Sequence, residues 1–225
     1  MKMKRTDPPP VKAVVLLSGG ADSATCLALA RKKGREVYAL SFDYGQRHRI
    51  ELSYARKLAR RLGCRAHRVA RVDLPGSAAS ALTSRKIRVP KGGVRPGTIP
   101  ATYVPARNAL FLAHALSWAE AIGAREIWIG ANVIDYSGYP DCRPAFLRAF
   151  ERMANLGTRA GVTGRRFQIV APLLKLSKKE IFRLGKALGI DLRWTFSCYD
   201  PQPHGKSCGR CDSCRLRNRA LADLE

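Results

Sequence analysis

Apolar runs of strand length alternate along this chain with longer segments whose apolar positions recur every three to four residues. The short runs have the length and composition of buried β-strands, and the longer segments have the period of helices with one apolar face. This alternation predicts an α/β fold, with a doubly wound, mostly parallel five-stranded sheet and helices on both of its faces. The predicted strands are 12–17, 36–42, 67–72, 126–130 and 167–171, and the predicted helices are 23–33, 49–62, 106–122, 143–159 and 178–188.

The alternation is interrupted over residues 74–105, which contain five prolines and four glycines and have no sustained period. We expect this excursion to run over the surface, and loops of that length in compact domains usually serve function. A chain of 225 residues is long enough for one α/β domain and a short appendage. We therefore predict a basic tail over 1–10, one catalytic domain over 11–194, and a cysteine tail with a terminal helix over 195–225.

Composition adds one unusual property, a formal net charge of +24. Such a charge favours anionic partners such as nucleotides. Because lysine and arginine are spread along the whole chain, a solvated basic surface explains them better than a nucleic-acid footprint does, and no nucleic-acid partner is required. No export signal or membrane span is visible, so we expect a cytoplasmic protein with no membrane partner.

A glycine-rich turn, the phosphate loop, joins the first predicted strand to the first predicted helix with the sequence Ser-Gly-Gly-Ala-Asp-Ser over residues 18–23. Backbone N–H groups and the positive end of a helix hold phosphate at such a turn, and glycines let the backbone approach it closely. The turn has neither the Gly-Lys-Ser/Thr of a Walker loop nor the dinucleotide Gly-x-Gly-x-x-Gly fingerprint. It resembles the Ser-Gly-Gly-x-Asp-Ser signature of the PP-loop ATP pyrophosphatases, with an ordinary glycine turn as the alternative.

Three further polar segments follow predicted strands or open predicted helices. Residues 41–48 lie at the carboxyl end of the second strand, where open α/β sheets bind ligands, although a solvated connector has the same composition. Residues 102–108 lead into a helix, where the guanidinium of Arg107 is either a fork for phosphate or carboxylate or a surface cation. Residues 130–144 combine aromatic, amide and charged groups suited to a flat purine-like base, and a tight turn explains only part of that run.

Four of the seven cysteines crowd together in the cysteine tail, with the spacing C-x9-C-x2-C-x2-C. Four thiolates can close a tetrahedral shell around one structural Zn²⁺ and so stabilise a tail that is too short for its own core. An iron–sulfur cluster is less well supported, because the bacterial run adds a further cysteine and a proline where this chain has Asn218 and Arg219. The predicted ligands are Cys208, Cys211 and Cys214, with Cys198 or His204 as the fourth.

Together, these segments resemble the 7-cyano-7-deazaguanine synthase (QueC) family, a branch of the PP-loop enzymes. The resemblance covers residues 14–217 and is most specific in the run Asp-Tyr-Ser-Gly-Tyr-Pro-Asp-Cys-Arg-Pro over 135–144. Ala21 and Ala145 stand where the family tends to carry leucine and glutamate. The resemblance implies an adenine nucleotide alpha hydrolase-like fold, an ATP-dependent ligase that makes 7-cyano-7-deazaguanine from 7-carboxy-7-deazaguanine and ammonia in queuosine biosynthesis, and a homodimer.

The resemblance further implies ATP with Mg²⁺ as cofactor, Cys198 as the fourth zinc ligand, and a role for each polar segment. Free ammonium is the expected nitrogen donor, because the chain has no room for a glutaminase domain. The residues expected to act in catalysis are Asp22, Ser23, Arg107 and Lys175. Those expected to bind ATP are Ser18, Gly19, Gly20, Asp22, Ser23, Asp43, Tyr44, Gly45 and Gln46. Those expected to face the deazapurine are Asp135, Tyr136, Asp141 and Arg143.

Two other functions share some of these features. A PP-loop enzyme that thiolates tRNA would use paired cysteines to carry sulfur and the positive charge to bind RNA. A non-catalytic zinc-ribbon protein would bind nucleic acid, but it would leave the phosphate loop unexplained.

Overall fold

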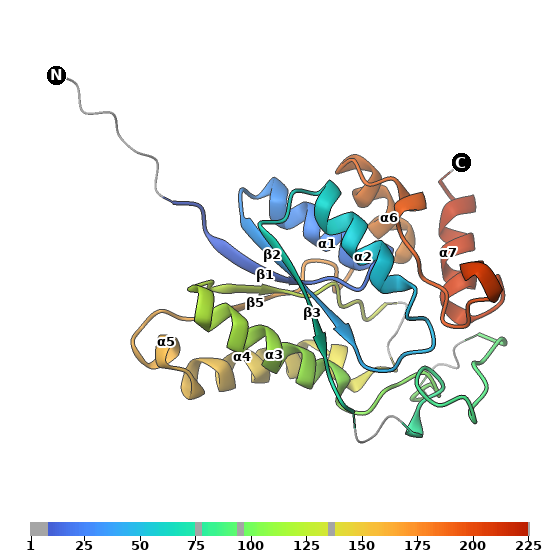
Figure 1. Ribbon diagram of the computed structural model, residues 1–225, viewed down its shortest axis with the longest axis horizontal. Helices are drawn as coiled ribbons and strands as arrows, with labels where there is room; N and C mark the ends of the chain where they lie inside the picture. Colours follow the sequence, from blue (N-terminus) through green and yellow to red (C-terminus); the bar gives the residue numbers. More distant parts are fainter. Residues whose placement is uncertain (1–8, 75–77, 94–96, 135–137, 225) are drawn as a thin grey trace.

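A five-stranded, fully parallel sheet forms the centre of the protein, with strand order β3-β2-β1-β4-β5 (Figure 1). The computed structural model describes residues 9–74, 78–93, 97–134 and 138–224. Each strand lies within a residue or two of a run that the sequence predicted. The signal is clearest in the central strands, because parallel strands buried on both faces are short, continuous and apolar. The strands are β1 Lys12–Leu16, β2 Glu36–Asp43, β3 Ala66–Arg71, β4 Glu126–Trp128 and β5 Gln168–Val170.

Helices cover both faces of this sheet, which confirms the predicted doubly wound arrangement (Figure 1). The segment predicted as one helix over 143–159 is instead two helices. Thr158 is extended between them, and its side chain accepts a hydrogen bond from the Gly161 N–H to cap the second helix. One face carries α1 Ala21–Lys32, α2 Glu51–Arg61, α6 Lys178–Ala187 and α7 Asp212–Ala222, and the other carries α3 Arg107–Ile122, α4 Pro144–Gly157 and α5 Arg159–Val162.

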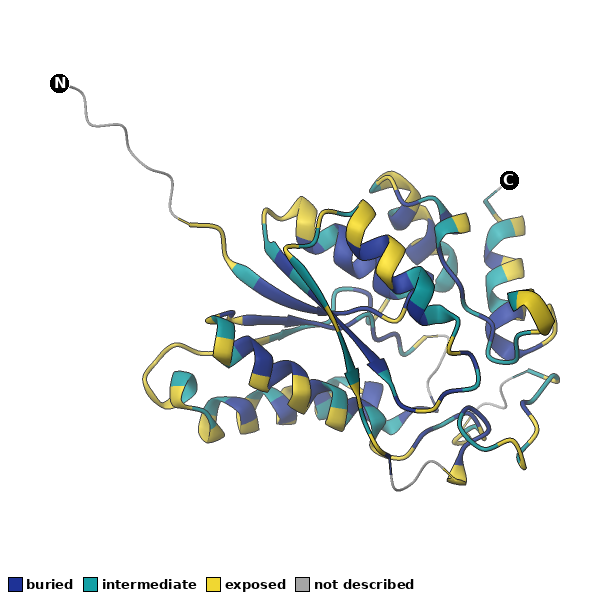
Figure 2. Cartoon of the chain, in the orientation of Figure 1, coloured by how far each residue is buried: buried dark blue, intermediate teal, exposed yellow. Residues whose placement is uncertain are grey.

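The core consists of two apolar layers that share the central strand β1. Val14 and Leu16 point into the layer beneath α3 and α4, whereas Ala13 and Val15 point into the layer beneath α1, α2 and α6. Successive side chains of a strand alternate between faces, so a strand between two helix layers is apolar at every position. Figure 2 shows the consequence, a buried sheet between helices whose outer faces are exposed.

The order of the strands places a crevice beside β1. From β1 the chain builds outward through β2 and β3, then crosses to the other side of β1 and adds β4 and β5. The loops that leave β1 and β4 therefore run to opposite faces and separate at the carboxyl ends of these two strands. Open α/β sheets bind ligands at such a switch point.

The 74–105 excursion is more deeply packed than a surface loop. Among its described residues, Ala81, Leu82 and Val89 are buried, and Ala81 and Val89 pack against the cysteine tail. Their spacing fits neither a helix nor a strand, so periodicity could not reveal them as core positions. Three short 3₁₀ helices complete the described structure, at Pro140–Cys142, Leu192–Trp194 and Pro203–Gly205.

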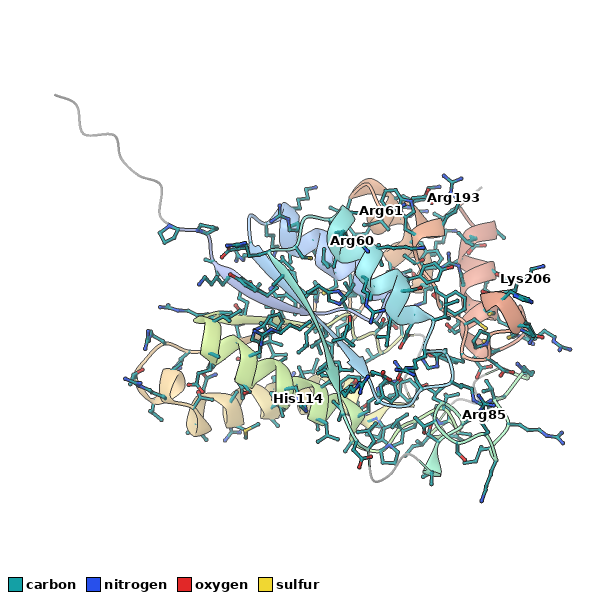
Figure 3. All side chains as sticks on the ribbon, in the orientation of Figure 1. Arg60, Arg61, Arg85, His114, Arg193 and Lys206 are labelled. Carbon is teal, nitrogen blue, oxygen red and sulfur yellow. The ribbon has the colours of Figure 1, made fainter. Side chains whose placement is uncertain are left out.

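Exposed cationic side chains are distributed over several elements, in accord with the sequence. Figure 3 labels Arg60 and Arg61 on α2, Arg85 in the excursion and Lys206 in the cysteine tail, all of them exposed. Within the described ranges, no helix has the length and apolarity that crossing a membrane demands.

Candidate nucleotide-binding pocket and cysteine cluster

A pocket opens at the switch point, where the carboxyl ends of β1, β2 and β4 meet the first turns of α1, α2 and α3. It brings together segments far apart in the sequence, including the phosphate loop, the 41–48 loop and the cysteine tail. Its polar and aromatic lining consists of Ser18, Asp22, Ser23, Phe42, Tyr44, His48, Glu51, Arg107, Asn108, Phe111, Asn132, Tyr139, Lys178, Phe196, Ser197, Tyr199 and Ser213.

The phosphate loop is held in shape by its own serines. The Ser23 hydroxyl donates to the Gly20 carbonyl at 3.0 Å and accepts from the Ser18 N–H at 3.2 Å. Gly19 is in the left-handed region with φ of +92°, and a Cβ there would stand 3.0 Å from the Ala55 backbone nitrogen and still closer to the Glu51 carbonyl oxygen. Only glycine fits this turn without strain, and the turn aims backbone N–H groups of the α1 amino end at the pocket.

Asp22 faces a lysine that the sequence analysis did not single out. Lys178, the first residue of α6, donates to both carboxylate oxygens of Asp22 at 2.8 and 2.7 Å, and its side chain is only 11% exposed. The predicted phosphate ligand Lys175 is exposed and lies outside the pocket lining. Residues 175 and 178 are one helical turn apart in sequence, but only the capping box of Ser177 and Glu180 fixes where α6 begins and which lysine points inward.

The 41–48 loop contributes less to the pocket than the sequence suggested. Of the four residues predicted to lie near adenosine, only Tyr44 lines the pocket. Gln46 is buried and structural, because its side chain accepts from the Tyr44 N–H at 2.9 Å and donates to the Phe42 carbonyl at 2.9 Å. Asp43 is paired with the exposed Arg49, and Gly45 is exposed.

An aromatic wall stands opposite the phosphate loop, with Arg107 against it. The rings of Phe42 and Phe111 are stacked with centroids 3.8 Å apart, and the Arg107 guanidinium lies 5.8 Å from the Phe111 ring and 6.0 Å from the Tyr44 ring. Burial raises the pKa of Tyr44 to about 12, so its phenol stays neutral. Among the described residues, the Arg107 Nε has no hydrogen-bond partner, which leaves one donor of a pocket-lining cation available to a ligand.

Only part of the segment predicted to bind a purine-like base lines the pocket. Asp141 is buried but accepts from the Asn108 N–H at 2.9 Å, so it positions the start of α3 and does not line the pocket. Arg143 is exposed and outside the lining. Asp135 and Tyr136 fall outside the described residues. Asn108, Tyr139 and Cys142, which neighbour predicted residues, do line the pocket.

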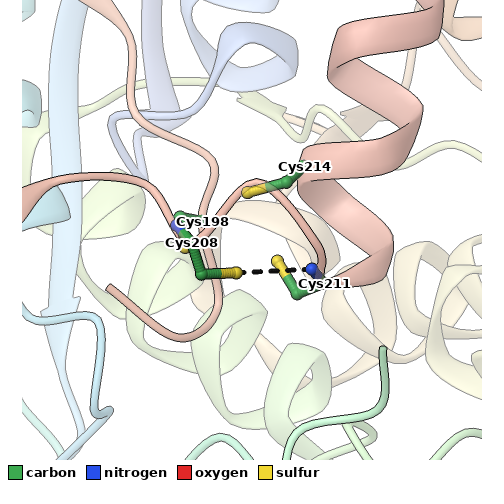
Figure 4. Close-up of side chains that lie close together, drawn as sticks. All are labelled: Cys198, Cys208, Cys211 and Cys214. Carbon is green, nitrogen blue, oxygen red and sulfur yellow. Dashed lines mark hydrogen bonds between the residues drawn. The ribbon is translucent and has the colours of Figure 1, made fainter. Parts of the chain in front are cut away.

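The four cysteines of the tail converge on a single point (Figure 4). The sulfur atoms of Cys198, Cys208, Cys211 and Cys214 all lie within 4.8 Å of one another. A tetrahedral Zn–S shell with bonds of about 2.3 Å has S···S edges of about 3.8 Å, so this cluster is of the right size for a metal ion. Hydrogen bonds from the Cys198 and Cys214 thiols lower the pKa of the Cys211 thiol. His204 is exposed and outside the cluster, so Cys198 is the fourth member.

The cysteine cluster is physically joined to the pocket. Phe196 donates its N–H to the Gly19 carbonyl at 2.9 Å, and its ring stacks on Tyr54 of α2. Ser197 and Tyr199, on either side of Cys198, line the pocket. A cysteine tail built as a separate structural appendage would not make these contacts, and the sequence contained no signal that placed the tail against the phosphate loop.

Comparisons with known proteins agree with this geometry. The profile of the family described as queuosine biosynthesis protein QueC matches residues 12–225. A 7-cyano-7-deazaguanine synthase of Azoarcus sp. (strain BH72) is 59% identical over 211 residues, covering 94% of this chain and 92% of that protein. Another, from Anaeromyxobacter sp. (strain Fw109-5), is 58% identical over 218 residues, covering 96% of this chain and 93% of that protein.

Solved structures support the fold. A structure described as a 4-thiouridine synthetase–RNA complex with bound ATP aligns with 95% of this chain and 50% of that chain, at 19% identity and a TM-score of 0.50. Such a likeness shows the PP-loop type of fold alone. The family profile and the two synthases, each matching over most of the chain, confirm the predicted resemblance, and the chain belongs to the QueC family of queuosine biosynthesis proteins.

Proposed function

We propose that this chain catalyses the ATP-dependent conversion of 7-carboxy-7-deazaguanine and ammonium to 7-cyano-7-deazaguanine. The observation that carries the proposal is that one pocket contains both the phosphate loop and the Phe42–Phe111 wall, in a chain 59% identical to a synthase of that name. A nucleotide triphosphate and a flat heterocycle can then lie side by side. A carboxylate resists attack by ammonia because oxide is a poor leaving group, and transfer of its oxygen to phosphorus removes that obstacle.

The reaction activates the carboxylate carbon of the substrate twice. The first replaces the carboxylate oxygen with nitrogen and gives an amide, and the second removes the amide oxygen and gives the nitrile. In this proposal the N–H groups of the phosphate loop, with Ser18, Ser23 and Lys178, would hold the phosphates of ATP. Asp22 would hold Mg²⁺, which would supply neutralisation of the phosphate charge. Arg107 neutralises the substrate carboxylate as it approaches, and no covalent nucleophile on the protein is required.

The remaining predicted site residues stay proposals, and the geometry of the pocket supports some of them more than others. Tyr44 and the Phe42–Phe111 wall are suited to stacking on a flat base, whereas Asp135, Tyr136 and Arg143 remain predicted contacts of the deazapurine. We infer that the cysteine cluster holds one Zn²⁺, because four sulfurs and no oxygen ligand favour zinc over hard cations. Homodimerisation and a cytoplasmic location stay predictions from the resemblance, and light scattering tests the former.

The test is a product assay. The metal-loaded protein is incubated with MgATP, ammonium and 7-carboxy-7-deazaguanine, and the nitrile is sought by mass spectrometry. Asp22→Ala should abolish the product while the metal content of the protein stays unchanged. Absence of nitrile from the wild-type protein, with ATP bound and metal present, would overturn the proposal.

A further inference from the structure

The pocket contains a second carboxylate, Glu51, to which the chemistry above gives no role. Glu51 is the first residue of α2 and lines the pocket, with a side chain 12% exposed. One carboxylate oxygen accepts from the Gln46 side-chain amide at 3.0 Å, and the other lies 3.5 Å from Nε2 of His48. Unlike Asp22, which Lys178 holds by both oxygens, Glu51 has no lysine or arginine within 4.0 Å among the described residues.

His48 is the buried neighbour of this carboxylate and helps to orient it. Its side chain is 7% exposed, it lines the pocket, and its Nε2 lies on the side of Glu51. Burial lowers the pKa of His48 to about 3, so the ring is neutral at physiological pH. Nδ1 lies on the other side of the ring, is enclosed by protein atoms and has no hydrogen-bond partner in the described structure. The group that can receive a small cationic donor is therefore the Glu51 carboxylate, beside a neutral ring that adds no competing positive charge.

Glu51 stands next to the place of activation. A Cβ on Gly19 would meet the backbone carbonyl of Glu51, so the first turn of α2 packs directly on the phosphate loop. A carboxylate whose oxygen attacks a phosphorus of ATP must bring its carbon close to that loop. A nitrogen nucleophile held by Glu51 would therefore lie beside the carbon that it attacks.

We propose that the Glu51 carboxylate, oriented by Gln46 and His48, binds ammonium and is the base that generates ammonia; this inference rests on the proposed function. Ammonium is a small cation with four N–H donors, and a chain with a net charge of +24 repels it unless a local negative charge compensates. Glu51 accepts one proton from ammonium. The nitrogen lone pair then forms the C–N bond, the bond from carbon to the phosphorylated oxygen breaks with its electron pair, and the second proton leaves with the phosphate.

The surroundings of Glu51 suit this task. Burial raises its pKa to about 7, against the smaller opposing effects of the Gln46 hydrogen bond and the Arg107 charge. The groups that face it are Tyr44, Gln46 and His48 from the preceding loop and Arg107 from α3. A base with a pKa near the working pH combines a substantial ionised fraction with enough basicity to take the proton.

The test compares two nucleophiles in Glu51→Gln, with Glu36→Gln as the matched control, because Glu36 lies at the far end of β2 in a surface pair with Arg65. Ammonium needs deprotonation, whereas hydroxylamine is a weaker base that is largely uncharged at neutral pH. We expect Glu51→Gln to lower kcat/KM for ammonium about 100-fold or more, the usual effect of removing a general base. Its hydroxamate formation should stay within about threefold of wild type, and the pH dependence of its ammonium reaction should lose one ionisation near neutrality.

Each other outcome overturns the inference in a distinguishable way. An unchanged kcat/KM for ammonium in Glu51→Gln removes the proposed role directly. Equal loss with both nucleophiles assigns Glu51 to folding or activation, and a selective rise in KM for the carboxy-deazaguanine assigns it to recognition of the base. If the wild type itself forms neither nitrile nor hydroxamate, the proposed function falls and this inference falls with it. A melting curve for each variant identifies loss of folding.

Discussion

The phosphate loop depends on Gly19 more than on any other described glycine of the pocket, and Gly19→Ala measures that dependence. Two costs arise at this position. The backbone has φ of +92°, which L side chains rarely adopt, and the new Cβ would collide with the Glu51 carbonyl and crowd the Ala55 nitrogen. A left-handed conformation costs a non-glycine residue about 1–2 kcal/mol, and overpacking in a buried site costs about 1–3 kcal/mol. The free energy of unfolding should therefore fall by about 2–5 kcal/mol.

Gly34 offers a control that separates the two costs. It is also left-handed, with φ of +72°, but a Cβ there meets no atom within 4 Å. Gly34→Ala should lose only the conformational part, about 1–2 kcal/mol, and leave ATP binding unchanged. Urea unfolding of both variants gives the difference, and calorimetry gives the affinity for ATP. Equal destabilisation of the two variants would show that α2 does not press on the phosphate loop, which would refute the packing argument.

Three further perturbations test the site. Lys178→Met should raise KM for ATP about tenfold or more, as loss of one charge-assisted contact does. The neighbouring Lys179 has a side chain that is 43% exposed and lies 3.7 Å from Asp223, so Lys179→Met should change KM less than about twofold. Burial raises the pKa of Glu51 from 4.5 to about 7, so between these pH values the folded state binds more protons than the unfolded state. The free energy of unfolding should therefore fall as pH rises through that window, by at most about 3 kcal/mol. Urea titrations at about pH 4.5–8 measure this slope, and Glu51→Gln should remove it. Chelation of the metal should lower the melting temperature by about 10 °C and weaken ATP binding, and Cys211→Ser should have the same effects. Cys64 lies outside the cluster, so Cys64→Ser should leave the metal content and the affinity for ATP unchanged.

The elements of this fold could be predicted from sequence because each is a local pattern. A strand such as β1 is apolar from Ala13 to Leu16 since both of its faces are covered there, and the glycines of the phosphate loop mark the turn that follows it. The four-cysteine cluster was also predictable, because the spacing of its cysteines is local. The contacts of the pocket were not. Asp141 had the chemistry to read a base, yet it binds the N–H of Asn108, and no local pattern distinguishes a carboxylate that positions a helix from one that faces a ligand.

Lys175 and Lys178 show the same limit at finer scale. Their side chains are chemically identical, but Lys175 precedes α6 and Lys178 is its first residue, so the start of the helix decides which one reaches Asp22. That start is set by the capping box of Ser177, whose pattern Ser-x-x-Glu was present in the sequence and would have favoured Lys178 as the first helical residue. The signal for the lysine that faces Asp22 was therefore available, but it lay in a cap and not in a motif of charged residues.

The position of the cysteine tail changes what a metal bound by the four cysteines would do in this protein. Metal binding to a short tail supplies folding free energy, and in an isolated tail that energy would order only the tail itself. Here Lys91 of the excursion pairs with Asp200 at 2.6 Å and lies 3.5 Å from the sulfur of Cys208, while Phe196 bonds the carbonyl of Gly19. The ordered tail thus fixes the excursion on one side and the phosphate loop on the other. Metal removal should consequently act on nucleotide affinity through Phe196, although none of the four cysteines lines the pocket.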